Sequence, residues 1–280
     1  MKFYSILLLS LNLLFFNQSL SQEAIQVKTR GEGQAILFLP GFANSSEVWE
    51  ETLEHLGNNY QFHMVDYAGF NGLQSVETPW LPKVKKGLQD YIVDNELKDL
   101  IIIGHSLGGT LAIYLAGELQ DQVQQIIIVD GLPNTSKLLF PNQKNGSFSY
   151  DNPYANAQLN MPTEQFKQML NQQVQMMCKN KEKHELITEW MVNTDRATYV
   201  KGFIDYLNFD ATPYLEKIEA KVLILGATSY GRAQSEQVYK NQYANLAEYD
   251  IKFAENSAHY VMYDQPEWYY QQINQALTDE

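Results

Sequence analysis

The chain is poor in cysteine, with Cys178 as the single example among 280 residues. A disulfide within the chain is therefore excluded, and so is a metal cluster built on several thiolates. Cys178 stands in an apolar helical pattern, which predicts a small residue of the core. A chain of this length can bury a substantial core without disulfides.

Positive charge is also scarce. The chain has 20 Lys and Arg against 33 Asp and Glu, which gives a net charge of −13 at pH 7. An acidic surface repels phosphate backbones and anionic lipid headgroups. We therefore expect no nucleic-acid partner and no stable association with a membrane.

A long apolar run occurs near the N-terminus, at residues 6–16, between Lys2 and the small residues Ser19 and Ser21. This arrangement is typical of a cleavable secretion signal. The run is too short to span a bilayer comfortably, although an uncleaved membrane tether stays open. We expect residues 1–21 to be removed and the mature protein, which begins at Gln22, to be periplasmic or secreted.

Short apolar runs alternate with helical patterns along the rest of the chain. They predict strands at residues 35–39, 62–65, 100–103, 126–129, 222–225 and 249–253. Helical patterns between them include 82–97 and 266–277. Strands that alternate with helices form βαβ units, so we expect an α/β fold with a mainly parallel sheet flanked by helices.

The alternation stops at residues 133–214, where no run resembles a strand. Helical patterns occur there at about 162–178, 184–192 and 197–207. This predicts an all-helical insertion at 133–214 into a core made of 22–132 and 215–280. The insertion carries an apolar stripe, expected mostly to pack on the core and in part to line an apolar pocket: Phe166, Met169, Leu170, Val174, Met176, Met177, Trp190 and Met191.

The most informative stretch is LIIIGHSLGG at residues 100–109. An apolar strand runs into the pattern Gly-x-Ser-x-Gly around Ser106, and a helical pattern follows. This context predicts a nucleophile elbow, a sharp turn that presents the Ser106 hydroxyl at the top of a sheet. Gly104 and Gly108 stand where side chains would crowd that turn.

With these motifs the chain resembles the α/β-hydrolase superfamily over about residues 33–278, and more narrowly its serine hydrolases with a helical cap. The glycine loop from Leu39 to Phe42 and the segment from Tyr263 to Glu267 add to the resemblance. In the family's numbering the run 35–39 is the third strand, so the cap is expected after the sixth strand.

The resemblance implies a catalytic triad. His259, in a loop after the last predicted strand, is the expected base for Ser106. Ser229 stands where the family usually has its aspartate, and no carboxylate occurs from 226 to 235. We therefore take Asp130, at the end of the strand before the insertion, as the acid. Asp210, or a dyad without an acid, stays open.

The same resemblance implies an oxyanion hole formed by the backbone N–H groups of Phe42 and Leu107. The other histidines have no further metal-binding residues near them in the sequence, so we expect no metal and no other cofactor. The expected activity is that of a serine hydrolase that cleaves a carboxylic ester, thioester or amide of a small-molecule acyl substrate. A non-catalytic ligand-binding protein and an aminopeptidase-type peptidase on the same fold are the alternatives.

Overall fold

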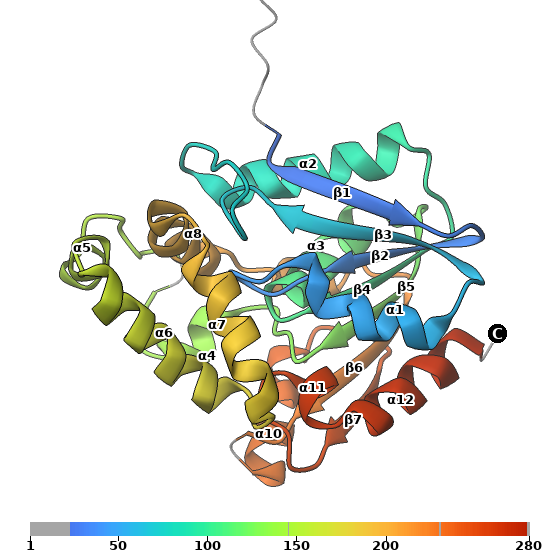
Figure 1. Cartoon of the computed structure of the whole chain (residues 1–280). Coiled ribbons are helices and arrows are strands. Elements are labelled where there is room, and N and C mark those ends of the chain that lie inside the picture. The colour runs from blue at the N-terminus through green and yellow to red at the C-terminus, as the bar shows by residue number, and fades with distance from the viewer. Residues whose placement is uncertain (1–22, 145, 230, 279–280) are drawn as a thin grey trace, which may run out of the picture.

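The computed structural model describes residues 23–144, 146–229 and 231–278 (Figure 1). The expected secretion signal at 1–21 lies outside the described residues. None of the helices within those ranges is long and apolar enough to cross a membrane.

Seven strands form one sheet in the order β1-β3-β2-β4-β5-β6-β7. Every neighbouring pair is parallel except β1 with β3. The strands are β1 (Ile25–Arg30), β2 (Gln34–Leu39), β3 (Tyr60–Tyr67), β4 (Leu100–His105), β5 (Val123–Val129), β6 (Lys221–Ala227) and β7 (Asp250–Ala254). The six expected strands are therefore present.

Strand β1 was not expected from the sequence. It lies at the edge of the sheet, and among its six residues only Ile25 is buried. An edge strand that contacts the core through one residue has almost no hydrophobic periodicity to reveal it.

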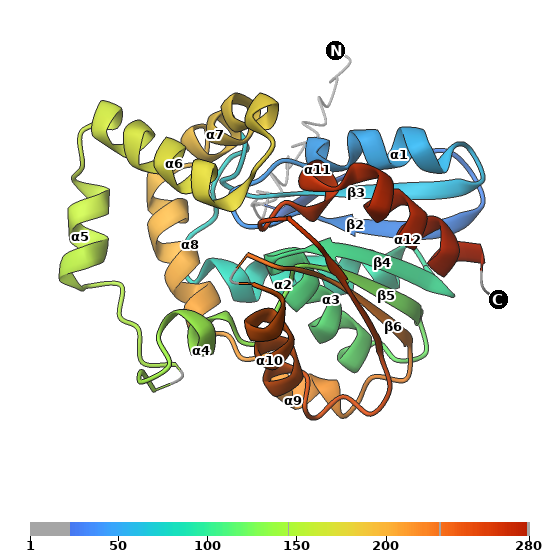
Figure 2. The same ribbon diagram turned by 90° about the horizontal axis from the view of Figure 1, so that it is seen from below.

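Helices cover both faces of the sheet, as the view in Figure 2 shows most clearly. One face packs against α1 (Glu50–Leu56) and α12 (Pro266–Thr278), and the other against α2 (Trp80–Asp94), α3 (Leu107–Glu118) and α10 (Arg232–Gln242). Successive side chains of a strand point to opposite faces of the sheet. In β4, Ile101 and Ile103 pack on the side of α1, whereas Ile102 packs on the side of α2 and α3. Because both faces are buried, the central strands have continuous apolar runs.

The helical insertion lies between β5 and β6, and most of its helices gather beside the sheet in both ribbon views. It contains α4 (Thr135–Leu139), α5 (Pro153–Leu159), α6 (Thr163–Met177), α7 (His184–Val192), α8 (Arg196–Asn208) and α9 (Thr212–Leu215). The expected position after the sixth strand needs correction, because the insertion follows the fifth strand of this sheet. Among the residues described from Glu23 onward, one strand, β1, precedes β2, whereas the family's numbering assumed two.

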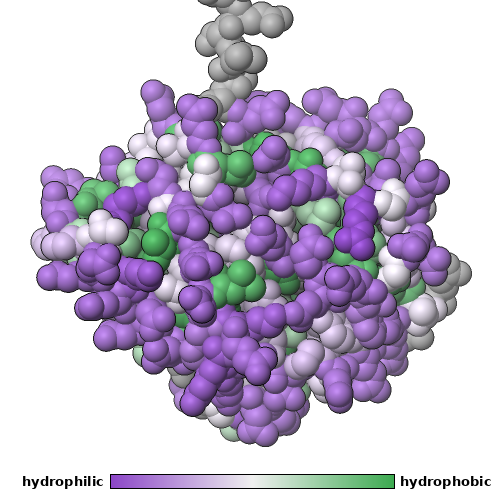
Figure 3. Space-filling view, viewed as in Figure 1, coloured by the Kyte–Doolittle hydropathy of each residue, from purple (hydrophilic) through white to green (hydrophobic). Residues whose placement is uncertain are grey.

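Most of the apolar stripe of the insertion is a packing surface. Phe166, Leu170 and Val174 of α6 are buried together with Trp190 and Met191 of α7. Met176 points outward, with 75% of its surface exposed. On the face that Figure 3 shows, hydrophilic residues predominate and apolar ones form small separate patches, as expected for this acidic composition.

Candidate active site

Ser106 lies in a sharp turn between the end of β4 and the start of α3. Its backbone is strained, with φ 54° and ψ −117°. A Cβ on Gly108 would lie 2.0 Å from the carbonyl oxygen of Leu39, and one on Gly104 would lie 2.3 Å from that of Gly108. Both positions therefore require glycine, and the turn has the form of the expected elbow.

Asp130 and His259 are brought together from distant parts of the chain. Asp130 follows β5, the strand next to β4, and His259 lies in the loop after β7. The Nδ1 atom of His259 is 2.6 Å from Oδ2 of Asp130. The pair is partly shielded, with side-chain exposures of 28% for His259 and 14% for Asp130.

The other oxygen of Asp130 has two further donors. Oδ1 accepts hydrogen bonds from the backbone N–H of Ala227, at 2.8 Å, and from the hydroxyl of Tyr239, at 2.6 Å. Burial alone would raise the pKa of Asp130, but the hydrogen bonds from His259, Tyr239 and Ala227 together hold it below its usual value. Asp130 is thus a carboxylate that can orient an imidazole.

The two other positions considered for the acid, Asp210 and Ser229, lie in surroundings different from those of Asp130. Oδ1 of Asp210 accepts hydrogen bonds from the backbone N–H and the hydroxyl of Thr212, and so caps the first turn of α9. Ser229 is exposed in the loop after β6. Among the three candidate positions, it is Asp130 whose carboxylate contacts His259.

His105, next to Ser106, is fully buried and supports the loop that carries His259. Its Nε2 lies 3.0 Å from the carbonyl oxygen of His259, so Nε2 carries a proton and donates. The two imidazole rings are 4.6 Å apart at their centroids. Burial, and to a smaller extent the neighbouring His259, lower the pKa of His105 to about 3. His105 is therefore neutral and structural.

The expected oxyanion donors belong to two well-supported backbone segments. Leu107 is the first residue of α3, so its N–H has no partner inside the helix. Phe42 lies in the loop after β2, and its carbonyl oxygen accepts a hydrogen bond from Nδ2 of Asn44 at 3.0 Å. Asn44 in turn accepts a hydrogen bond from the hydroxyl of Tyr260, beside His259. Sequence reasoning had not identified this link.

An aromatic group surrounds the side chain of Phe42. Its ring is 5.0–6.0 Å from four other rings, each in an edge-on arrangement: Phe70, Trp80, Tyr199 and Phe203. Tyr199 and Phe203 belong to α8, so the insertion contributes directly to the surroundings of the oxyanion loop. We refer to these five residues as the aromatic wall.

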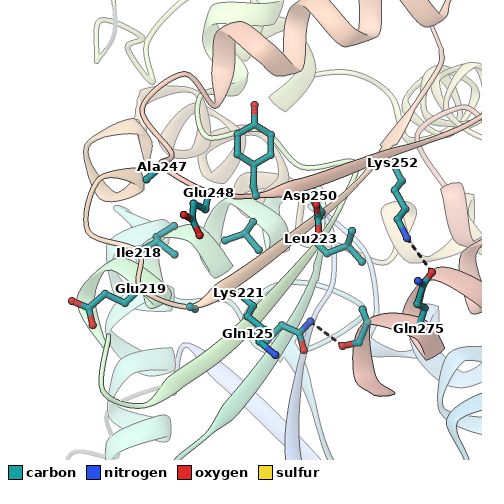
Figure 4. A pocket seen from close by; sticks show the side chains of 14 residues that line it. Gln125, Ile218, Glu219, Lys221, Leu223, Ala247, Glu248, Asp250, Lys252 and Gln275 are labelled. Carbon is teal, nitrogen blue, oxygen red and sulfur yellow. Dashed lines mark hydrogen bonds between the residues drawn. The ribbon is translucent and has the colours of Figure 1, made fainter. Parts of the chain in front are cut away.

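A hollow of about 770 Å³ opens at the end of the sheet where the parallel strands begin, opposite to the end that carries Ser106 (Figure 4). Gln125, Lys221 and Asp250 lie there, at or near the beginnings of β5, β6 and β7. Strand β6 runs for seven residues from Lys221 to Ala227, a length of roughly 20 Å at the usual rise of a strand. The hollow is therefore remote from Ser106. Within the described ranges, no cluster of three or more histidine, cysteine or acidic side chains could hold a metal ion.

The comparisons with known proteins agree with this fold. Residues 36–272 match the model of the alpha/beta hydrolase family, which is more than half of the chain. The protein belongs to this family.

Two curated relatives are pimeloyl-[acyl-carrier protein] methyl ester esterases. The one from Nitrosospira multiformis is 31% identical over 122 residues, 42% of this chain and 46% of its own length. The one from Nitrosomonas europaea is 29% identical over 110 residues, 39% of this chain and 42% of its own length. The chain thus spans less than half the length of the curated relatives it matches.

Solved structures resemble the whole described fold. An esterase from Exiguobacterium antarcticum superimposes with a TM-score of 0.75 at 19% identity, covering 91% of this chain and 96% of that one. An enol-lactonase from Burkholderia xenovorans gives a TM-score of 0.74 at 13% identity, with the same coverage. At such low identities the likeness concerns the fold alone.

The position of the acid can be tested by comparing two isosteric variants. Asp130→Asn removes the charge that orients and stabilises the imidazolium, so kcat for p-nitrophenyl butyrate should fall about 10⁴-fold. Asp210→Asn should keep kcat within about twofold, because Asp210 caps a short helix and its loss affects mainly stability. A near-normal kcat in Asp130→Asn would contradict the assignment.

The buried His105 predicts a pH dependence of stability. Its pKa is lower in the folded than in the unfolded chain, so the unfolded state binds more protons between about pH 6.5 and pH 3. The free energy of unfolding should therefore decrease as the pH falls through this window, by up to about 1.4 kcal/mol per pH unit. The lowered pKa of Asp130 acts only below about pH 3.8, so the two effects separate.

The measurement is urea unfolding from pH 7 to pH 4.5 for the wild type and His105→Gln. Glutamine retains a donor for the carbonyl of His259 but does not titrate. The variant should lose roughly 2 kcal/mol less than the wild type across this range. Parallel curves would show that His105 is not buried in its neutral form.

Proposed function

We propose that this protein is a serine hydrolase that cleaves carboxylic esters of small molecules through an acyl-enzyme on Ser106. The observation that carries the proposal is the contact of 2.6 Å between His259 and Asp130 at the edge of the sheet where the Ser106 elbow stands. A serine hydroxyl becomes a useful nucleophile only beside an oriented base.

The reaction proceeds in two halves. Oγ of Ser106 attacks the carbonyl carbon while His259 accepts its proton, and the N–H groups of Phe42 and Leu107 stabilise the oxyanion. His259 then protonates the leaving alcohol, which departs and leaves the acyl group on Ser106. A water molecule, deprotonated by His259, attacks the ester, and the proton returns to Ser106 as the acid leaves. Asp130 stays ionised and stabilises the imidazolium in both halves.

The names of the similar proteins support ester cleavage as the reaction class, since they include methyl ester esterases, an esterase and an enol-lactonase. Pimeloyl-[acyl-carrier protein] is not carried over as the substrate, because the matched segments cover less than half of each relative. The aromatic wall around Phe42 favours an acyl or alcohol group that is apolar and uncharged.

The rival interpretation, a non-catalytic binding protein, was suggested by Ser229 at the usual position of the acid. The contact between Asp130 and His259 supports the proposal that Asp130 takes the place of that acid, from the end of the neighbouring strand. For the peptidase alternative, the described part of the insertion contains no acidic side chain that we can assign to a substrate amine.

Covalent labelling tests the proposed function without knowledge of the natural substrate. A fluorophosphonate should form one adduct with the wild type and none with Ser106→Ala, because the reagent requires an activated serine. Hydrolysis of p-nitrophenyl esters of increasing acyl length should be lost in the same variant. A wild-type protein that neither reacts nor hydrolyses any ester would refute the proposal.

We further propose that the protein is exported, on the basis of the N-terminal residues described above. Mass spectrometry of the protein recovered from the periplasm or medium should give a chain that begins at Gln22. Recovery of the intact chain from the cytoplasm would contradict export.

A further inference from the structure

The hydroxyl of Tyr239 contacts the triad acid from the side opposite to His259. It donates to Oδ1 of Asp130 at 2.6 Å, and the backbone N–H of Ala227 donates to the same oxygen at 2.8 Å. Oδ2 is left for His259. The torsion of an aspartate carboxyl group is soft, so donors on one oxygen decide where the other oxygen points.

The ring of Tyr239 is held in place by its own packing. It is 5% exposed and lies parallel to the ring of Tyr243, with centroids 6.0 Å apart, while Phe253 meets it edge-on at 5.4 Å. A Cβ on Gly226 would lie 2.9 Å from the Phe253 ring and 3.1 Å from that of Tyr239. Glycine at the end of β6 therefore leaves the space that lets this hydroxyl reach Asp130.

The charge state of Tyr239 fits a donor. Burial raises its pKa well above the usual value, and the negative charge of Asp130 raises it further. Other titratable groups that face the pair are Tyr206 on α8, Tyr243 directly after α10 and His105 on β4. Burial raises the pKa of both tyrosines, so neither supplies a competing charge near neutral pH.

We propose that Tyr239 is a positioning residue of the triad, which holds the Asp130 carboxylate so that Oδ2 faces His259. The inference rests on the proposed function. It also explains how an acid at the end of β5 can work: β6 contributes the N–H of Ala227, and the helix that follows β6 contributes the hydroxyl. Both elements thus support an acid that they do not carry.

The test compares Tyr239→Phe with Tyr243→Phe in fluorophosphonate labelling. Tyr243 lies one helical turn away in the same stack, but its hydroxyl donates to the carbonyl of Gly131 and not to Asp130. Tyr239→Phe should slow the maximal rate of labelling about tenfold with little change in the reagent concentration at half-maximal rate. Tyr243→Phe should stay within about twofold of the wild type.

The pH profile separates positioning from general packing. Without the hydrogen bond from the Tyr239 hydroxyl, the negative charge of Asp130 is less stabilised and holds the proton of His259 more strongly. The acidic limb of the labelling rate should then move to higher pH by about half a unit. In an Asp130→Asn background, Tyr239→Phe should add less than about twofold, since no carboxylate remains to be oriented.

A second substitution protects the test against unfolding. Tyr239→3-fluorotyrosine keeps the ring and hydroxyl but makes the hydroxyl a stronger donor, so the acidic limb should move to lower pH. If the wild type is labelled and both Tyr239 variants show the same labelling rate and the same pH dependence as the wild type, the positioning role alone is overturned. Absence of any Ser106-dependent labelling in the wild type would instead overturn the proposed function.

Discussion

Two backbone hydrogen bonds beyond the ends of the central strands hold the site in register. The N–H of Ser106 donates to the carbonyl of Val129 at 2.9 Å, and the N–H of Asp130 donates to the carbonyl of Leu225 at the same distance. The parallel ladder therefore continues through the turn of each strand. Both residues have positive φ, 54° for Ser106 and 45° for Asp130, a strained conformation that persists only where the surroundings impose it.

The sequence predicted those parts of the site that depend on local patterns. The elbow around Ser106 combines a strand, a turn and a helix within ten residues, and the helices of the insertion have clear periodicity. The sequence favoured Asp130 as the acid but did not exclude Asp210 or a dyad without an acid, because the chain pattern does not show which side chain reaches His259. Only the alignment of β5 with β6 and the approach of the His259 loop separate them. Tyr239 and Asn44 were missed for the same reason: each acts through a partner more than 100 residues away.

The position of Asp130, the proposed acid, determines which elements surround the proposed triad. The loop after β6, free of the acid, presents the exposed Ser229, while the N–H of Ala227 and the helix α10 stabilise the carboxylate of the neighbouring strand. The loop that carries His259 is held separately by two hydrogen bonds. Nε2 of His105 donates to the carbonyl of His259, and the hydroxyl of Tyr260 donates to Oδ1 of Asn44. The geometry of the proposed triad thus depends on several hydrogen bonds distributed along the carboxyl ends of the strands.

Helix α8 is part of the insertion by sequence, yet its contacts tie it to the core. Asp205 accepts hydrogen bonds from the backbone N–H groups of Trp80 and Leu81, and the N–H of Asp195 donates to the carbonyl of Gly69 at 2.7 Å. Anyone who builds chimeric hydrolases from this scaffold should therefore cut the chain before α8. Exchange of α5–α7 alone would change the outer part of the insertion. Removal of α8 would also take away the Asp205 cap of α2 and two rings of the aromatic wall around Phe42.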